Sequence, residues 1–304
     1  MPRPLKIGVQ LPEVEREVGW PELISMAQAA EVVGFDSIWL GDHLLYDLDG
    51  GPRGPWEVWT SLAVLATVTS RIELGPLVAS TAFHSPAMLA KQAATVEAVS
   101  NGRLILGVGA GWNAREFSAF DLRFDRRVDR FAEAFTIITE LARTGRCTFE
   151  GEFNSVQDCI IHPRGPREGG PPILVGSNGP RMLRLTMPHA DMWNTWWSDI
   201  DNSPTGFVEM MGAVDAACED VGRDPSEITR TCALLVRLEG GTGRRMGDHT
   251  DEQPQPISGS PAQIADAISA FATAGAHHVQ LVLDPITEAS IEGLGPVLDL
   301  LDAR

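Results

Sequence analysis

The stretch that decides the fold runs from residue 104 to residue 112 and reads Leu-Ile-Leu-Gly-Val-Gly-Ala-Gly-Trp. Its first five residues are apolar or glycine, which is typical of a strand covered on both faces in a parallel sheet. The glycines at 107, 109 and 111 let backbone N–H groups face a ligand without a Cβ in the way. The spacing differs from the GxGxxG of dinucleotide-binding folds. The stretch therefore predicts a buried strand that ends at a ligand-binding loop.

The same pattern recurs along the chain, where short apolar runs alternate with amphipathic stretches. This alternation is typical of parallel strands joined by crossover helices. Pro21, Pro86 and Pro261 stand where first helical turns should begin. Strands are expected at 5–10, 37–40, 72–77, 104–108, 173–175, 191–194, 231–236 and 278–283. Eight such units predict an α/β fold, a (β/α)8 TIM barrel, for which 304 residues is a normal length.

Two segments interrupt the alternation. Residues 146–172 contain a predicted hairpin over 148–153 and then a loop rich in proline and glycine. Residues 239–256 are polar and rich in glycine. Both are interpreted as insertions into a single domain that spans residues 1–304.

Composition narrows the class of function. The net charge of −17 opposes binding to nucleic acid and to anionic membrane surfaces, because like charges repel. No apolar window reaches the length of a membrane span, and the N-terminus lacks the apolar region of a secretory signal. The four cysteines are far apart and have no metal-ligand spacing, so no metal is expected. A cytoplasmic enzyme is the resulting expectation.

Candidate site residues follow the predicted strands, because function in a barrel collects where strands end. After the second strand, Asp42 and His43 could supply a hydrogen bond to a cofactor and a proton-transfer group; alternatively, Asp42 caps a turn and His43 faces solvent. After the sixth strand, Trp196 and Trp197 could wall a pocket or lie in the core.

Two further strand ends offer backbone and small side chains to a ligand. Gly75, Ala79 and Ser80 would let a flat ring approach the backbone closely. The loop Gly176-Ser177-Asn178-Gly179 precedes Pro180, which is expected to open a helix. That loop is either a phosphate cradle or a tight turn.

Taken together, these motifs resemble the luciferase-like monooxygenases, and most of all their actinobacterial branch that uses the deazaflavin coenzyme F420. The resemblance is close over residues 5–195 and loose beyond. It rests on the stretches Gly34 to His43, Ser70 to Gly75, Ser85 to Lys91, Ser100 to Trp112 with Glu116, and Pro172 to Pro180 with Ala190 to Asn194.

The resemblance implies roles for particular residues. Asp42 matches an acid that contacts the coenzyme ring region, and His43 matches the proton-transfer histidine of several deazaflavin-dependent dehydrogenases. A non-prolyl cis peptide is expected at or next to Leu77-Val78. Further contacts to the ring or the phosphate-bearing tail are expected from Val78, Ala79, Ser80, Ala110, Gly111, Gly176, Ser177, Asn178 and Gly179.

One residue departs from the family pattern. Trp112 stands where the sugar-phosphate dehydrogenases of this family carry a glutamate acid, so glucose 6-phosphate is not expected as a substrate. A bulkier or more apolar substrate is expected instead, in a pocket shaped by Trp112, Trp196 and the 146–172 insertion. Glu116 is interpreted as a residue that fixes a loop.

The leading hypothesis is a coenzyme F420-dependent oxidoreductase that transfers hydride between the coenzyme and a small organic substrate, with His43 moving the proton. A homodimer is expected from the resemblance. One alternative is an FMN-dependent monooxygenase that uses O2 and a separate reductase. A lesser alternative is a non-catalytic barrel that binds a ligand without turnover.

Overall fold

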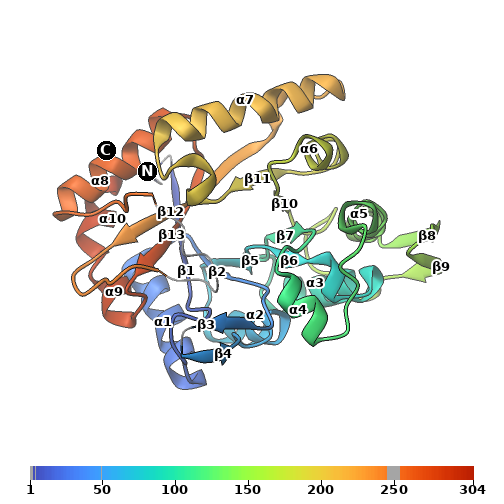
Figure 1. The fold of residues 1–304 in the computed structure, drawn as a ribbon, viewed down its shortest axis with the longest axis horizontal. Helices are drawn as coiled ribbons and strands as arrows, with labels where there is room; N and C mark the ends of the chain where they lie inside the picture. Colours follow the sequence, from blue (N-terminus) through green and yellow to red (C-terminus); the bar gives the residue numbers. More distant parts are fainter. Residues whose placement is uncertain (1–2, 4, 49, 245–253) are drawn as a thin grey trace.

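The computed structural model of this chain describes residues 3, 5–48, 50–244 and 254–304, and its main feature is a nearly closed barrel of nine parallel strands (Figure 1). The strands lie in the order β5-β2-β1-β13-β12-β11-β10-β7-β6. A parallel bridge between Leu74 and Leu104 joins the two sides of the sheet. The strands are β1 (Lys6–Gln10), β2 (Ser37–Leu40), β5 (Glu73–Pro76), β6 (Ala79–Ser80), β7 (Leu106–Gly109), β10 (Ile173–Gly176), β11 (Met192–Thr195), β12 (Thr229–Arg237) and β13 (His278–Asp284).

Helices cover the outside of the barrel (Figure 1). Prolines begin several of them, because a first-turn residue needs no N–H donor: α3 and α8 start at Pro86 and Pro261, as predicted. Ser260 and Gln263 form a capping box at α8. The helices are α1 (Trp20–Val33), α2 (Val58–Val68), α3 (Pro86–Val99), α4 (Ala114–Ala119), α5 (Arg127–Thr144), α6 (Pro180–Thr186), α7 (Pro204–Asp220), α8 (Pro261–Thr273), α9 (Glu288–Glu292) and α10 (Gly295–Asp302). No helix in the described ranges is long and apolar enough to cross a bilayer.

All eight predicted strands are present, with ends shifted by up to two residues. The ninth, β6, was not predicted, because two residues are too few to give a periodic pattern. It follows a non-prolyl cis peptide between Leu77 and Val78, which confirms the prediction for that bond.

The interior of the barrel is filled by the Trp39 indole, which is 0% exposed, together with Ile105, Leu174 and Met192. A Cβ on Gly75 would lie 3.2 Å from Cζ3 of Trp39. A Cβ on Gly8 would lie 2.6 Å from Nε1 of the same indole. Gly75 was expected to make room for a cofactor ring; the ring that it accommodates is this buried tryptophan.

The predicted hairpin is present as β8 (Arg146–Glu150) and β9 (Ser155–Ile160), which extend beyond the expected 148–153. It lies at the outer edge of the molecule beside α5 (Figure 1). A second hairpin, β3 (Tyr46–Leu48) with β4 (Gly51–Arg53), was not predicted. Of the other expected insertion, 239–256, residues 245–253 lie outside the described residues.

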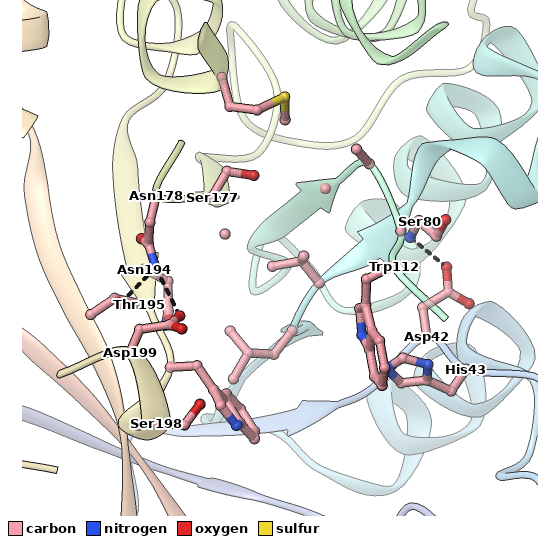
Figure 2. A pocket seen from close by; sticks show the side chains of 18 of the residues that line it. Asp42, His43, Ser80, Trp112, Ser177, Asn178, Asn194, Thr195, Ser198 and Asp199 are labelled. Atoms are coloured by element: carbon pink, nitrogen blue, oxygen red, sulfur yellow. Dashed lines mark hydrogen bonds between the residues drawn. The ribbon is translucent and has the colours of Figure 1, made fainter. Parts of the chain in front are cut away.

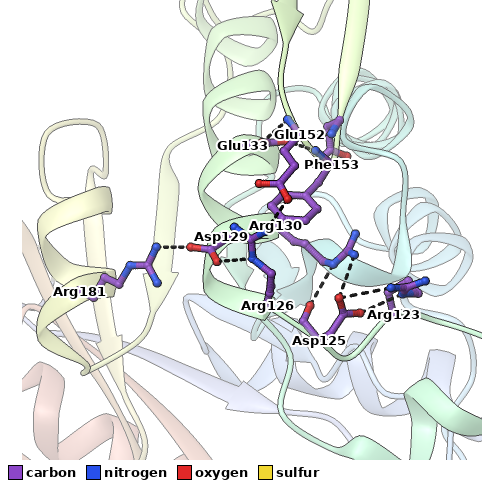
Figure 3. A network of polar contacts seen from close by, with 10 residues as sticks. Arg123, Asp125, Arg126, Asp129, Arg130, Glu133, Glu152, Phe153 and Arg181 are labelled. Carbon is purple, nitrogen blue, oxygen red and sulfur yellow. Dashed lines mark hydrogen bonds and ion pairs between the residues drawn. The ribbon is translucent and has the colours of Figure 1, made fainter.

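A polar network holds the β8–β9 turn against α5 (Figure 3). The Glu133 carboxylate accepts hydrogen bonds from the backbone N–H groups of residues 152, 153 and 154. The guanidinium groups of Arg126 and Arg130 lie 4.6 and 4.4 Å from the centre of the Phe153 ring. Asp129 binds both Arg126 and Arg181, which ties α5 to the first turn of α6. The hairpin is therefore anchored outside the barrel.

Candidate active site

A cavity of about 670 Å³ opens at the carboxyl ends of the barrel strands. Two sets of side chains face each other across it (Figure 2). We call them the first wall, which comprises Asp42, His43, Ser80, Trp112 and Glu116, and the second wall, which comprises Asn178, Asn194, Thr195, Trp196 and Asp199. The first wall follows β2, β6 and β7, whereas the second follows β10 and β11.

Asp42 is buried just after the end of β2 and binds the backbone of β6. Its Oδ2 accepts a hydrogen bond of 2.8 Å from the backbone N–H of Ser80 and lies 3.7 Å from Nε2 of His84. The Ser80 hydroxyl is itself buried, and within the described ranges it has no hydrogen-bond partner. Asp42 thus fixes the backbone of Ser80, whose hydroxyl has no hydrogen-bond partner in the described residues and lies beside the cavity.

His43 and Glu116 form a buried pair on the first wall. Nδ1 of His43 lies 2.9 Å from Oε1 of Glu116. The same oxygen accepts a 3.0 Å hydrogen bond from Nδ2 of Asn113, the residue that caps α4. Because a carboxylate can only accept, Nδ1 of His43 is the donor and Nε2 is the ring nitrogen that remains for a ligand.

The electrostatic surroundings favour the charged form of His43. Burial alone lowers the pKa of His43, but the hydrogen bond to Glu116 and the charges of Glu13, Glu116 and Asp42 outweigh it. The net result is a pKa raised above the ordinary value. Glu116 was interpreted only as a loop-fixing residue; it does bind Asn113, but it also orients and charges the histidine.

Glu13 also lines the cavity, and no sequence motif pointed to it. Its Oε1 accepts a 2.7 Å hydrogen bond from Gln10, and its Oε2 lies 3.3 Å from Arg244. Burial raises the pKa of Glu13 although the charge of Arg244 opposes this. Arg244 comes from the 239–256 segment, so only the fold brings the two residues together.

The floor of the cavity is formed by Leu77 and Val78. The Val78 side chain occupies the space left by two glycines: a Cβ on Gly109 would lie 2.8 Å from it, and one on Gly176 would lie 3.1 Å from it. Ala79 does not line the cavity, because successive side chains of a strand point to opposite faces and its methyl group lies in the core.

Eight of the ten predicted cofactor-binding residues line the cavity. Besides Ala79, the exception is Gly179, which is the N-cap of α6. The eight are Asp42, Val78, Ser80, Ala110, Gly111, Gly176, Ser177 and Asn178.

The second wall is held by hydrogen bonds from the Asn178 amide. Nδ2 of Asn178 donates to Oγ1 of Thr195 at 3.1 Å and to Oδ2 of Asp199 at 2.8 Å. The Asn178 side chain therefore points to Asp199, which leaves Ser177 and the loop backbone for any phosphate-bearing tail (Figure 2). Burial raises the pKa of Asp199.

The predicted pocket tryptophans, Trp112 and Trp196, both line the cavity, as does Trp197. The expectation that residues 146–172 shape the pocket is wrong. All of these residues are described and none of them lines the cavity, because the hairpin packs on the outer face of α5. Pro254, from the other insertion, does line it.

Comparison with known proteins places this site in a family. The family model described as luciferase-like monooxygenase matches residues 6–240. The chain is 32% identical over 244 residues to an F420-dependent glucose-6-phosphate dehydrogenase of Amycolatopsis mediterranei, covering 77% of this chain and 70% of the relative. It is 29% identical over 242 residues to an F420-dependent hydroxymycolic acid dehydrogenase of Mycobacterium tuberculosis, covering 77% of this chain and 64% of the relative.

A monooxygenase and a further F420-dependent enzyme are among the similar proteins as well. A pyrimidine monooxygenase of Pantoea ananatis is 34% identical over 186 residues, which cover 58% of this chain and half (50%) of the relative. An F420-dependent secondary alcohol dehydrogenase bound to an F420-acetone adduct has the same fold, with a TM-score of 0.83 at 17% identity over 98% of this chain and 99% of that one. From the extent of the family match we conclude that the chain belongs to the luciferase-like monooxygenase family.

Proposed function

We propose that this protein is an oxidoreductase that uses the deazaflavin coenzyme F420 to exchange hydride with a small organic substrate. The observation that carries the proposal is the His43–Glu116 pair, which leaves Nε2 of the histidine for a ligand at the edge of a cavity. F420-dependent relatives at 32% and 29% identity support the choice of coenzyme.

The residues present fit a flat ring system. Val78, packed between Gly109 and Gly176, gives an apolar surface for one ring face, and the unpartnered Ser80 hydroxyl offers a polar contact at its edge. Ser177 and the backbone of residues 176–178 would hold a phosphate-bearing tail. When bound, the coenzyme supplies or accepts the hydride.

The chain's own residues would transfer the proton and enclose the substrate. Glu116 holds Nδ1 of His43, so that Nε2 gives a proton to a carbonyl oxygen or takes one from a hydroxyl. Trp112 and Trp196 exclude water from the neighbouring substrate space. Trp112 cannot donate a proton as the glutamate of the sugar-phosphate dehydrogenases would, so the histidine is left as the proton-transfer group.

Parallel titrations with F420 and FMN test the proposal. We expect saturable quenching of coenzyme fluorescence with F420 and weaker binding of FMN. Tight binding of FMN, together with substrate-dependent O2 consumption, would instead establish the monooxygenase alternative, which the pyrimidine monooxygenase relative keeps open. Failure of the folded protein to bind either coenzyme would overturn both.

A further inference from the structure

The side chains that line the cavity carry more acidic groups than basic ones. Four carboxyl groups line it, from Glu13, Asp42, Glu116 and Asp199, and the described lining residues include no lysine or arginine. Three of the four pair with a basic side chain. Glu13 pairs with Arg244, Asp42 lies 3.7 Å from Nε2 of His84, and Glu116 binds His43.

Asp199 is the exception. Its side chain accepts a hydrogen bond from the Asn178 amide, and a hydrogen bond from the backbone of Trp196 also lowers its pKa. It has no ion-pair partner among the residues that the structure describes. Asp199 is exposed, so its carboxylate keeps acceptor capacity that a ligand can reach at one side of the cavity.

Aromatic side chains line the cavity on both sides. Asp199 lies in the short turn Trp197–Ile200, and both Trp196 and Trp197 line the same cavity, with the Arg244 guanidinium 5.4 Å from the centre of the Trp196 ring. Trp112 lies beside His43, across the cavity from Asp199, and is 45% exposed (Figure 2). A carboxylate beside indole faces attracts an organic ammonium group through its charge and through cation–π contact. It repels a phosphate or carboxylate.

We propose that the substrate of this cavity carries a protonated amine on an apolar body, and that Asp199 is the residue that selects the positive charge. This proposal rests on the function proposed above. It assumes that the ligand bound at the second wall is the substrate, and that this substrate exchanges hydride with the coenzyme beside the first wall. The amine would donate to Asp199, while its apolar part lies against the indoles.

Three probes with one carbon skeleton test the charge preference without any coenzyme: 4-phenylbutylamine, 4-phenylbutan-1-ol and 4-phenylbutanoate. Quenching of tryptophan fluorescence reports their binding, since three tryptophans line the cavity. We expect the amine to bind about five- to tenfold more tightly than the alcohol, and the carboxylate to bind most weakly. Added NaCl should reduce the difference.

The variant Asp199→Asn keeps an acceptor for Asn178 but removes the charge. It should lower the affinity for the amine about five- to tenfold and leave the alcohol unchanged. Asp220→Asn, at the exposed end of α7, removes the same charge far from the cavity and should change none of the three affinities. Asp199→Lys should reverse the order of amine and carboxylate.

Each of three outcomes would overturn the proposal. The three probes bind with equal affinity, none of them binds, or the Asp199→Asn variant keeps the full preference for the amine. Should the variants fail to fold, the order of the three affinities and their salt dependence in the native protein still decide it. Failure of the proposed function is separate, because it would show as absent coenzyme binding while the charge preference persists.

Discussion

The two walls of the cavity differ in how their polar groups are held. On the first wall, each ionisable side chain has a fixed partner: Asp42 binds the Ser80 N–H, and His43 binds Glu116. On the second wall, Asp199 has no ion-pair partner among the described residues and keeps unused acceptor capacity. A group that must transfer a proton benefits from a fixed position, whereas a surface that recognises a ligand needs free partners. We therefore propose that the first wall transfers the proton and that the second wall recognises the substrate.

The largest effect should come from His43→Ala. We expect turnover to fall by about 10²- to 10⁴-fold, because the variant removes the group that transfers the proton. Coenzyme affinity should change little, since the Asp42–Ser80 hydrogen bond remains. Stopped-flow absorbance and a coenzyme titration measure the two quantities separately. His189→Ala, on the exposed surface, is the control, and unchanged turnover in His43→Ala would show that His43 is not the proton-transfer group.

A smaller effect is expected from Glu116→Gln, which keeps a hydrogen-bond acceptor for His43 but removes a negative charge. Because Glu116 raises the pKa of His43, the variant should lower that pKa. In the direction that needs protonated His43, the rate falls as pH rises through its pKa, and this fall should move to lower pH. We expect turnover to drop about tenfold near neutral pH.

The pH–rate profile separates this role from a purely structural one, because a loosened loop would lower the rate at every pH without moving the profile. Glu292→Gln, on the exposed end of α9, is the matched control. An unshifted profile in Glu116→Gln would show that the charge of Glu116 does not act on the histidine.

The smallest effect should come from Asn178→Ala on the second wall. It removes two hydrogen bonds, so we expect the free energy of unfolding to fall by about 1–2 kcal/mol and the KM for substrate to rise a few-fold. The kcat should stay nearly unchanged. Urea denaturation and steady-state kinetics measure these quantities. A loss of kcat as large as that of His43→Ala would contradict the division between the walls.

The sequence predicted the barrel well because each of its eight long strands is a local apolar run. It also predicted Asp42, His43 and Trp196, which directly follow strands. It could not predict the contact between His43 and Glu116, which lie 73 residues apart, or the one between Glu13 and Arg244. Such contacts depend on how loops cross the mouth of the barrel. The prediction that the 146–172 hairpin lies at the pocket was wrong for the same reason, because the contact of the hairpin with α5 is a tertiary contact.

The buried indole of Trp39, for which Gly8 and Gly75 leave room, fills the barrel beneath the cavity. A ligand therefore has no passage through the barrel and must come and go by the strand-end mouth. Two ligands that share one mouth leave in the reverse of their order of entry. We accordingly expect a compulsory-order kinetic mechanism, in which an excess of the ligand that binds second inhibits by occupying the mouth before the first.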